Sequence, residues 1–438
     1  MRLGSTHHRA PTVSFREALV RSLAPDGGLY MPVALPRFDE AQLESWRDLS
    51  FSDLAVRLAQ GLIGDEFPAD VIERLVREAL NFPVPTKPVE GRHSVLELFH
   101  GPTLAFKDVG ARFLARFFGY VLADRDEQAT VLVATSGDTG SAVAQGFYQV
   151  PNVRVVVLYP AGKVSAFQES QMATLGGNVT AVRLAGDFDE CQRLVKQAFL
   201  DERLTQRRLA SANSINVGRL LPQSFYYVAS YLAVRRRPGD RVVFSVPSGN
   251  LGNLTAGLLA ASFGLPIAQF VAATNANVAF TDFLGTGAYS ARPSIPTVSS
   301  AMDVGNPSNI QRVAERYASF DELRQHVSAL SIDERSTRDC IRRVYERAGY
   351  MLDPHGAVGY AAAERFGAAH PGDDPIVTLA TAHPAKFGRV IKEELGFEPP
   401  LPDERYRGWQ SRPILAVDMP GGPYDVFRDF LLSLEPVN

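Results

Sequence analysis

Apolar residues recur along the first 85 residues at the spacing of amphipathic helices. Residues 50–63 and 68–82 each place apolar side chains three and four positions apart, and Pro68 or Asp70 suits the start of the second helix. A proline-rich segment, residues 83–88, then separates this part of the chain from the rest. We therefore expect a mostly helical N-terminal domain over residues 1–85.

From about residue 90 the pattern changes to short apolar, β-branched runs separated by helical segments. The runs lie at 130–134, 153–159, 241–246, 267–273 and 375–380, and the helical segments at 106–123, 141–149, 188–200, 219–235, 254–263 and 356–366. This alternation is typical of parallel sheets covered by helices on both faces. The sequence therefore predicts an α/β protein in which ligands bind where strand ends meet helix starts.

Composition narrows the class of protein. At 45% hydrophobic and 21% charged residues, the 438-residue chain resembles an ordinary soluble globular protein of two or three domains. A net charge of -3 gives no reason to expect nucleic acid or an acidic membrane as a partner. No apolar run reaches the roughly 18 residues that indicate a membrane span.

The first residues and the cysteines favour the cytoplasm. Residues 1–15 lack the apolar stretch of a secretory signal. Cys191 and Cys340 are far apart and have no Cys or His at metal-ligand spacing, so we expect reduced thiols and no metal site.

Lysine is rare in this chain, which draws attention to Lys107. The 45 cationic residues include six lysines, and Lys107 opens an apolar helix after the segment LFHGPTLAF. A partly desolvated amine near the positive end of a helix tends toward a lowered pKa, which Schiff-base formation requires. A surface lysine at a helix end explains this segment alone equally well.

Two strand-to-helix turns are rich in small polar residues. ATSGDTGS, residues 134–141, combines Ser136, Asp138 and Thr139 with glycines and suits an anion, although a plain helix cap also fits it. VPSGNLGNL, residues 246–254, contains Gly249 and Gly252, which let the backbone approach a phosphate. It lacks the lysine of nucleotide-hydrolase loops, and the chain has no GxGxxG sequence typical of dehydrogenases.

A last apolar strand ends in TLATAHPAKFG, residues 378–388, which brings Thr381, His383 and Lys386 to the same sheet edge. A single histidine in such a place is more often structural than catalytic, so we assign His383 no role.

Taken together, these segments resemble the threonine synthase family. The resemblance rests on LFHGPTLAFKD, TSGDTG, SGNLG and TAHPAKF, and continues through GGLYMP (27–32), YPAGKVSAFQE (159–169), SANSIN (211–216), AATNAN (272–277), SSAMDV (299–304) and PHGAV (354–358). It covers nearly the whole chain in one order.

The resemblance implies a pyridoxal-phosphate (PLP) enzyme of fold type II, with two α/β lobes and an extra N-terminal domain. We expect an N-terminal domain over 1–85, a large PLP-binding domain over 86–125 and 236–438, and a small domain over 126–235. Lys107 is then the residue that forms a Schiff base with the cofactor. Cofactor contacts are implied for Asp138, near the phenolic oxygen where the family commonly has Asn, for the phosphate cradle Gly249, Asn250, Leu251, Gly252 and Asn253, and for Thr381 at the pyridine nitrogen.

The implied reaction converts O-phospho-L-homoserine and water into L-threonine and phosphate, with Lys107 as the base. We predict Ser136 and Thr139 as ligands of the substrate carboxylate, and Lys163, Asn213, Asn216 and Lys386 as ligands of its phosphate. A dehydratase or phospholyase of the same fold, or a catalytically silent binding protein, are the alternatives. The oligomeric state, monomer or homodimer, is left open.

Overall fold

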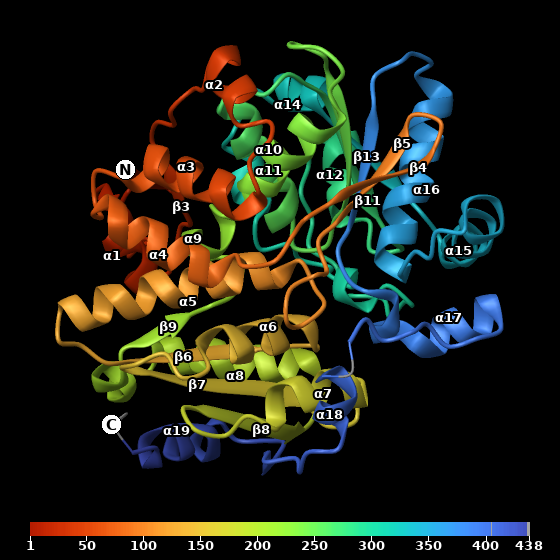
Figure 1. Ribbon diagram of the computed structural model, residues 1–438. Coiled ribbons are helices and arrows are strands. Elements are labelled where there is room, and N and C mark those ends of the chain that lie inside the picture. The colour runs from red at the N-terminus through yellow and green to blue at the C-terminus, as the bar shows by residue number, and fades with distance from the viewer. Residues whose placement is uncertain (404, 436–438) are drawn as a thin grey trace.

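The computed structural model describes residues 1–403 and 405–435, whose helices and strands form two stacked α/β units and a smaller N-terminal unit (Figure 1). None of the helices in these ranges combines the length and the hydropathy needed to cross a bilayer. The strands form a six-stranded, a five-stranded and a three-stranded sheet.

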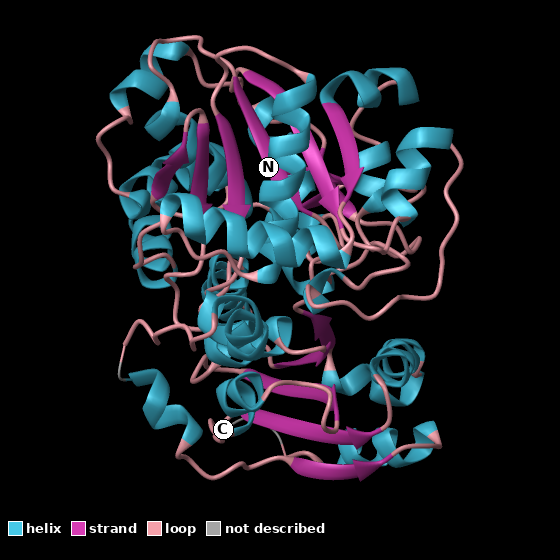
Figure 2. Cartoon of the chain, turned by 90° about the vertical axis from the view of Figure 1, so that its right-hand side faces the viewer, coloured by secondary structure: helices cyan, strands magenta, loops and turns pink. Residues whose placement is uncertain are grey.

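The six-stranded sheet has the order β12-β11-β10-β13-β5-β4. All neighbouring pairs are parallel except β4 with β5. Its strands are β4 (Thr86–Glu90), β5 (His93–Glu97), β10 (Val242–Pro247), β11 (Ile267–Thr274), β12 (Val327–Ser331) and β13 (Ile376–Ala380). Helices on both faces are seen in Figure 2, as the alternating pattern predicted. The helices of this unit are α9 (Val217–Leu220), α10 (Gln223–Val234), α11 (Gly252–Ser262), α12 (Ala279–Thr286), α13 (Ile310–Ala314), α14 (Phe320–His326), α15 (Glu334–Ala348), α16 (Pro354–Ala369) and α17 (Gly388–Leu395), with short 3-10 turns η2 (Ser300–Met302) and η3 (Pro384–Phe387).

The five-stranded sheet has the order β14-β8-β7-β6-β9 and is parallel throughout. Its strands are β6 (Ala129–Ala134), β7 (Val153–Pro160), β8 (Val179–Ala185), β9 (Leu209–Ser211) and β14 (Val417–Pro420). The elements around it are α5 (Lys107–Asp124), α6 (Asp138–Phe147), α7 (Ala166–Ala173), α8 (Phe188–Leu200), η1 (Glu202–Arg207), α18 (Arg405–Gln410) and α19 (Tyr424–Ser433).

Successive residues of the central strands enter different cores because side chains alternate across a strand. In β10, Phe244 packs with the cluster that contains α10 and α11, whereas Val243 packs with the cluster that contains α16. In β6, Val133 faces the α5 side and Leu132 faces the α8 side. Both sheets are therefore buried on two faces, which explains their uninterrupted apolar runs.

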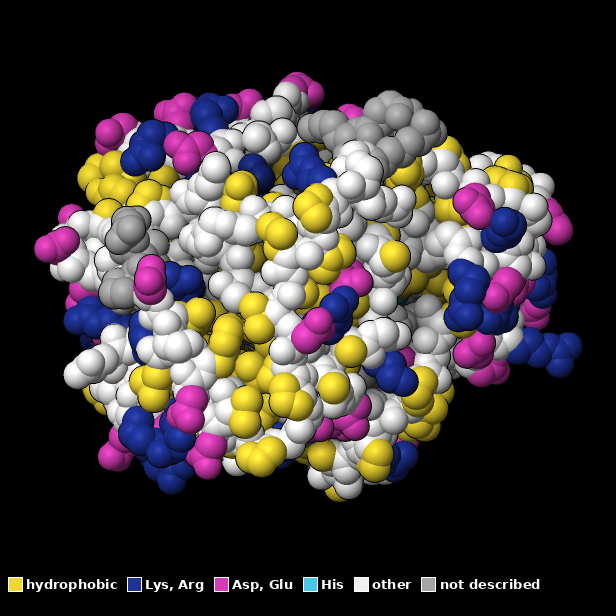
Figure 3. Space-filling view, turned by 90° about the horizontal axis from the view of Figure 1, so that it is seen from below, with side chains coloured by type: hydrophobic (Ala, Val, Ile, Leu, Met, Phe, Trp, Pro, Cys, Tyr) yellow, Lys and Arg dark blue, Asp and Glu magenta, His cyan; other side chains and the backbone are white. Residues whose placement is uncertain are grey.

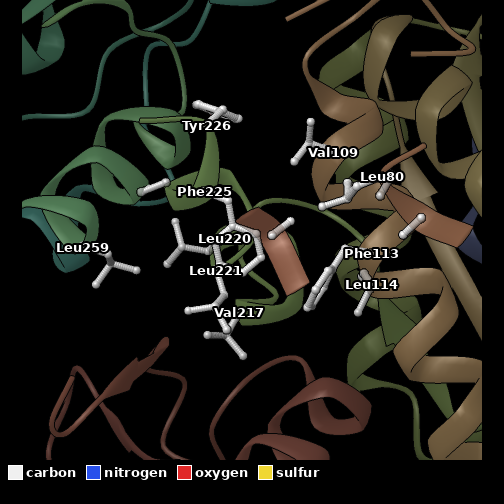
Figure 4. Close-up of a cluster of buried hydrophobic side chains, with 14 of the residues drawn as sticks. Leu80, Val109, Phe113, Leu114, Val217, Leu220, Leu221, Phe225, Tyr226 and Leu259 are labelled. Carbon is white, nitrogen blue, oxygen red and sulfur yellow. The ribbon is translucent and has the colours of Figure 1, made fainter. Parts of the chain in front are cut away.

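Helix α5 lies between the two sheets and joins their cores (Figure 1). Val109, Phe113 and Leu114 lie in one cluster with residues of α9 and α10, such as Leu220 and Phe225 (Figure 4). The apolar length of α5 thus anchors Lys107, its first residue, to both units.

The N-terminal part is mostly helical, as expected, but it also contains a small sheet. Besides α1 (Phe15–Arg21), α2 (Glu40–Ser45), α3 (Phe51–Ile63) and α4 (Ala69–Ala79), it contains an antiparallel sheet of β1 (Arg2–Ser5), β2 (Val13–Ser14) and β3 (Tyr30–Pro32). These strands have two to four residues each, too few for a period to stand out in the sequence.

Two parts of the predicted domain division need correction. Residues 417–420 were assigned to the large domain, but β14 pairs with β8 of the five-stranded sheet. Residues 217–235 were assigned to the small domain, but α10 packs with α3 and α11 beside the large sheet.

Seen from below, hydrophobic side chains gather on the face toward the viewer (Figure 3). Ile414, Leu415 and Val417 of the C-terminal segment are exposed.

Candidate active site

Lys107 lies at the junction of the two sheets because the loop before it is bonded to the end of β13. The amide of Phe106 donates to the carbonyl of Thr381 at 2.8 Å, and Ala105 forms an antiparallel bridge with Ala382. The Lys107 side chain is only 13% exposed. Burial lowers the pKa of its amine, and the charges of Lys386 and Arg219 lower it further, against the opposing effect of Asp138.

Asp138, at the start of α6, faces Lys107 from the five-stranded unit. Its Oδ2 lies 3.5 Å from Lys107 Nζ, whereas its Oδ1 lies 2.7 Å from Lys386 Nζ and accepts a hydrogen bond of 2.9 Å from Gln168 Nε2. Burial would raise the pKa of this carboxyl, but the two lysines and Gln168 hold it well below its usual range. Asp138 is therefore a buried carboxylate.

The turn after β10 forms the other wall. Leu251 adopts a left-handed conformation, with φ +60°, directly before α11. A Cβ on Gly249 would lie 2.9 Å from Met302 Cα and 3.1 Å from the Ala301 carbonyl oxygen, so only glycine fits there. Gly252 and Asn253 open α11, whose first amides have no carbonyl partner within the helix and form an anion site.

A cavity of about 1800 Å³ joins these elements. It brings together most of the predicted site residues, namely Lys107, Ser136, Asp138, Thr139, Lys163, Asn213, Gly249, Asn250, Leu251, Gly252, Asn253, Thr381 and Lys386. Ser136 and Lys163 lie exposed at its wall, whereas Thr381 and Lys386 are buried in it. The volume is more than a cofactor and a small substrate need, since ligand sites commonly measure about 300–1,000 Å³.

Known proteins with this arrangement identify the family. The pattern of pyridoxal-phosphate dependent enzymes matches residues 94–382, that of the threonine synthase N terminus residues 2–80, and that of the threonine synthase C-terminal region residues 356–421. Threonine synthase of Escherichia coli (strain K12) is 43% identical over 421 residues, covering 96% of this chain and 97% of the relative. The chain belongs to the threonine synthase family.

Solved structures of this family agree over the whole length. PLP-bound threonine synthase from Brucella melitensis superposes with a TM-score of 0.92 at 37% identity, covering 98% of each chain. The crystal structure from Escherichia coli gives a TM-score of 0.90 at 41% identity, covering 99% of each chain. The expected family, the fold type II architecture and the pyridoxal-phosphate cofactor are thereby confirmed.

The residues around the cavity also fit PLP on their own geometry. The glycine turn leaves room for a phosphate at the start of α11, and Asn253 Nδ2 is buried there without a hydrogen-bond partner. A poorly solvated amine, Lys107, and a buried hydroxyl residue, Thr381, lie in the same cavity. An aldehyde, a ring nitrogen and a phosphate each find a suitable group there.

The prediction that Asn216 binds substrate was wrong. Its side chain is fully buried away from the cavity, where Oδ1 caps α9 by accepting from Gly218 N, and Nδ2 donates to Leu19 O, Ser22 Oγ and Ser211 O. Both polar atoms of the amide are therefore used inside the protein, where they cap α9 and join it to β9 and to the N-terminal unit. An Asn beside another Asn in SANSIN gave no means to tell the structural one from Asn213.

Sequence reasoning missed Arg219 and Gln168. Arg219 lines the cavity with only 3% of its surface exposed, and its Nε is buried without a hydrogen-bond partner. Burial lowers its pKa to about 10, which still leaves the guanidinium charged at neutral pH. Arg219 lies in a predicted helical segment whose pattern indicates only packing. Gln168 lies in the segment YPAGKVSAFQE, which carries the family resemblance but does not mark this residue as part of the site.

His355, in the segment PHGAV, was also missed as a site residue. Its Nδ1 lies 2.7 Å from Asp353 Oδ2, and its Nε2 accepts a hydrogen bond of 3.1 Å from Ala301 N. The Asp353 contact places the proton on Nδ1, which leaves Nε2 free to accept. His355 thus holds the η2 turn against Gly249.

Proposed function

We propose that the protein converts O-phospho-L-homoserine and water into L-threonine and phosphate, using PLP attached to Lys107. The observation that carries this proposal is the position of the Lys107 amine. It is buried at the start of α5, faces Asp138, and shares one cavity with the glycine turn at 249–253. The names of the relatives supply the product, threonine. The substrate is the one that the family resemblance implies, and the chemistry of the cavity walls agrees with it.

The cofactor would be held at three points. The backbone amides of Gly249 to Asn253 would bind its phosphate at the start of α11. Thr381 offers a hydroxyl to the pyridine nitrogen, and Asp138 lies toward the phenolic oxygen. When bound, PLP withdraws electrons from the substrate carbons and so stabilises the negative charge that develops on them.

Lys107 moves the protons. Its lowered pKa favours the neutral amine, which accepts a proton from the α carbon and then from the β carbon of the substrate. The balance of the reaction is simple: phosphate leaves from Cγ, water adds at Cβ, and protons return to Cγ and Cα. Phe106, whose ring centroid lies 4.8 Å from Lys107 Nζ, helps to keep water from the amine.

The two ends of the substrate require different ligands. Ser136 and Thr139, at the N-terminus of α6, suit the carboxylate. Arg219, Asn213 and Lys163 suit the phosphate, because Arg219 Nε and Asn213 Oδ1 are buried without protein partners and Lys163 is exposed at the wall. A phosphate proton would satisfy Asn213 Oδ1. Lys386 is left out of this set, since its ammonium already bonds to Asp138.

The test compares the protein with its Lys107→Ala variant. We expect the wild type with PLP to show a visible absorption band and to release phosphate and threonine in equal amounts from O-phospho-L-homoserine. Lys107→Ala should lose the band and at least about 10³-fold in kcat, since both attachment and proton transfer are removed. Lys392→Gln, on the surface of α17, is the matched control.

Other outcomes point elsewhere. Phosphate release without threonine would keep the fold and make the protein a phospholyase. Full turnover in Lys107→Ala would overturn the assignment of Lys107.

We propose that the protein works in the cytoplasm, which agrees with two buried, unpaired thiols at Cys191 and Cys340.

A further inference from the structure

The two oxygens of Asp138 have different partners. Oδ1 accepts from Gln168 Nε2 at 2.9 Å and lies 2.7 Å from Lys386 Nζ, while Oδ2 is turned toward Lys107 Nζ at 3.5 Å. The carboxylate is thus held through one oxygen, and the other faces the place where the cofactor would join Lys107.

Lys386 is held as firmly as Asp138. Its side chain is fully buried, and its ammonium also donates to Thr103 O at 2.8 Å and to Gln171 Oε1 at 3.4 Å. These contacts come from the loop before α5 and from α7, whereas Lys386 itself follows β13 of the large sheet. One ammonium therefore ties the large sheet to the helices α6 and α7 of the five-stranded unit.

Glycine makes this approach possible. Gly137, which precedes Asp138, has φ +139°, and a Cβ there would lie 2.5 Å from Gln168 Cδ. Any other residue at 137 would displace the amide that holds Asp138 Oδ1.

We propose that Lys386 is a positioning residue that keeps Asp138 ionised and oriented, so that the two form a neutral pair beside Lys107. A lone carboxylate there would repel the phenolate of PLP, and the buried ammonium removes that repulsion. Asp in place of a neutral amide at 138 and Lys at 386 therefore depend on each other. This inference rests on the proposed function for the identity of the cofactor.

A nearby carboxyl supports the argument by contrast. Asp108 is fully buried on α5 and accepts two hydrogen bonds from Thr103, at 2.8 and 2.7 Å, but burial raises its pKa. Asp138 is also buried, yet its pKa is lowered, with the charges of Lys386 and Lys107 as the leading opposing causes. The two pKa shifts therefore differ in direction, and the carboxyl with the lowered pKa is the one whose oxygens lie beside lysine ammonium groups.

The charged groups that face the pair come from two elements. They are Lys107 and Asp108 on α5 and Arg219 on α9. Removing the positive charge of Lys386 should make protonation of the bound chromophore easier. Removing the negative charge of Asp138 should make it harder.

The experiment is a pH titration of the visible band of the full-length, PLP-loaded protein. We expect the midpoint of Lys386→Gln to rise and that of Asp138→Asn to fall, each by about one pH unit. The double variant Asp138→Asn/Lys386→Gln should return close to the wild-type midpoint, and Lys386→Arg should stay near it. Lys392→Gln, which removes an exposed lysine paired with Glu398 at 3.0 Å, is the matched control.

Thermal unfolding of the PLP-free variants keeps the test independent of cofactor loading. Each single variant should melt below the wild type, and the double variant should melt above Lys386→Gln. If the titration midpoints of the two single variants moved in the same direction, or if the double variant melted below both single variants, the pairing would be overturned. Absence of a visible band in the wild type would overturn the proposed function instead, while the melting series would still decide the pairing.

Discussion

Two strand-to-helix turns face each other across the cavity and recognise charge in different ways. The turn after β6 places a charged side chain, Asp138, into the site and surrounds it with side-chain partners. The turn after β10 places backbone amides and the neutral side chain of Asn253 there, with Gly249 in close contact with the η2 turn. A side-chain carboxylate needs a buried countercharge, whereas a backbone cradle needs only the absence of a Cβ. Two turns of the same strand-to-helix type therefore depend on different features, one on a buried positive charge and the other on a missing side chain.

The largest expected effect comes from removing the charge of the first turn. Asp138→Ala leaves the ammonium of Lys386 buried without its carboxylate, so we expect a loss of about 3–5 kcal/mol in the free energy of unfolding. Chemical denaturation measures it, with Asp189→Ala on the exposed face of α8 as the control. A loss below about 1 kcal/mol, the range of surface pairs, would show that the pair is solvated.

In the turn after β10, we expect a larger side chain to disrupt the binding of PLP. Gly249→Ala places a methyl group against Met302 and the Ala301 carbonyl, and such overpacking costs about 1–3 kcal/mol. Because the strain falls on the phosphate cradle, PLP affinity should drop about tenfold or more, as titration of the visible band will show. Gly285→Ala, where an added Cβ meets nothing within 4 Å, should leave the affinity unchanged.

A smaller effect is expected inside the first turn. Thr135 Oγ1 accepts from Gly137 N at 2.9 Å and from Gly140 N at 2.8 Å. Thr135→Val leaves these two buried amides without an acceptor and should cost about 1–3 kcal/mol in unfolding free energy. Thr135→Ser keeps the hydroxyl and should recover most of the loss, and equal losses in both variants would instead assign the effect to packing.

The smallest expected effect is on the pH dependence of the unfolding free energy, which should differ between variants of the two turns. Since the folded pKa of Asp138 lies below its unfolded value, its ionised form stabilises the fold above about pH 4, and this stabilisation is lost as the pH falls toward the folded pKa. Asp138→Asn should therefore reduce the acid slope of unfolding free energy by up to about 1.4 kcal/mol per pH unit. Gly249→Ala changes no titratable group and should keep the wild-type slope.

Much of the fold could be read from the order of apolar runs, because long buried strands and helices leave a clear period. The predicted runs at 130–134, 153–159, 241–246, 267–273 and 375–380 all lie within one or two residues of β6, β7, β10, β11 and β13. β8, β12 and the short strands β9 and β14 were not predicted, and neither was the placement of β14 on the five-stranded sheet. Pairing between strands far apart in the chain leaves no mark on the local pattern.

The site residues also differ in how much the sequence could predict about them. Lys107, Asp138 and the glycine turn were found from the sequence because each sits in a short segment whose residue types already serve one purpose. The sequence also singled out Lys386 and Asn216 as polar residues. In the structure, however, Lys386 contacts Asp138, and Asn216 lies away from the cavity with its amide bonded to Leu19 O.

The sequence by itself determined the α/β alternation, the position of Lys107 at the start of an apolar helix and the two glycine-containing turns, since local spacing and residue chemistry are enough to define them. Only the tertiary structure decided which charges meet. Lys386 follows Asp138 by 248 positions in the chain, yet their side chains lie 2.7 Å apart. Burial then sets the strength of that contact, because an ion pair removed from water is no longer screened and neither partner can be lost alone.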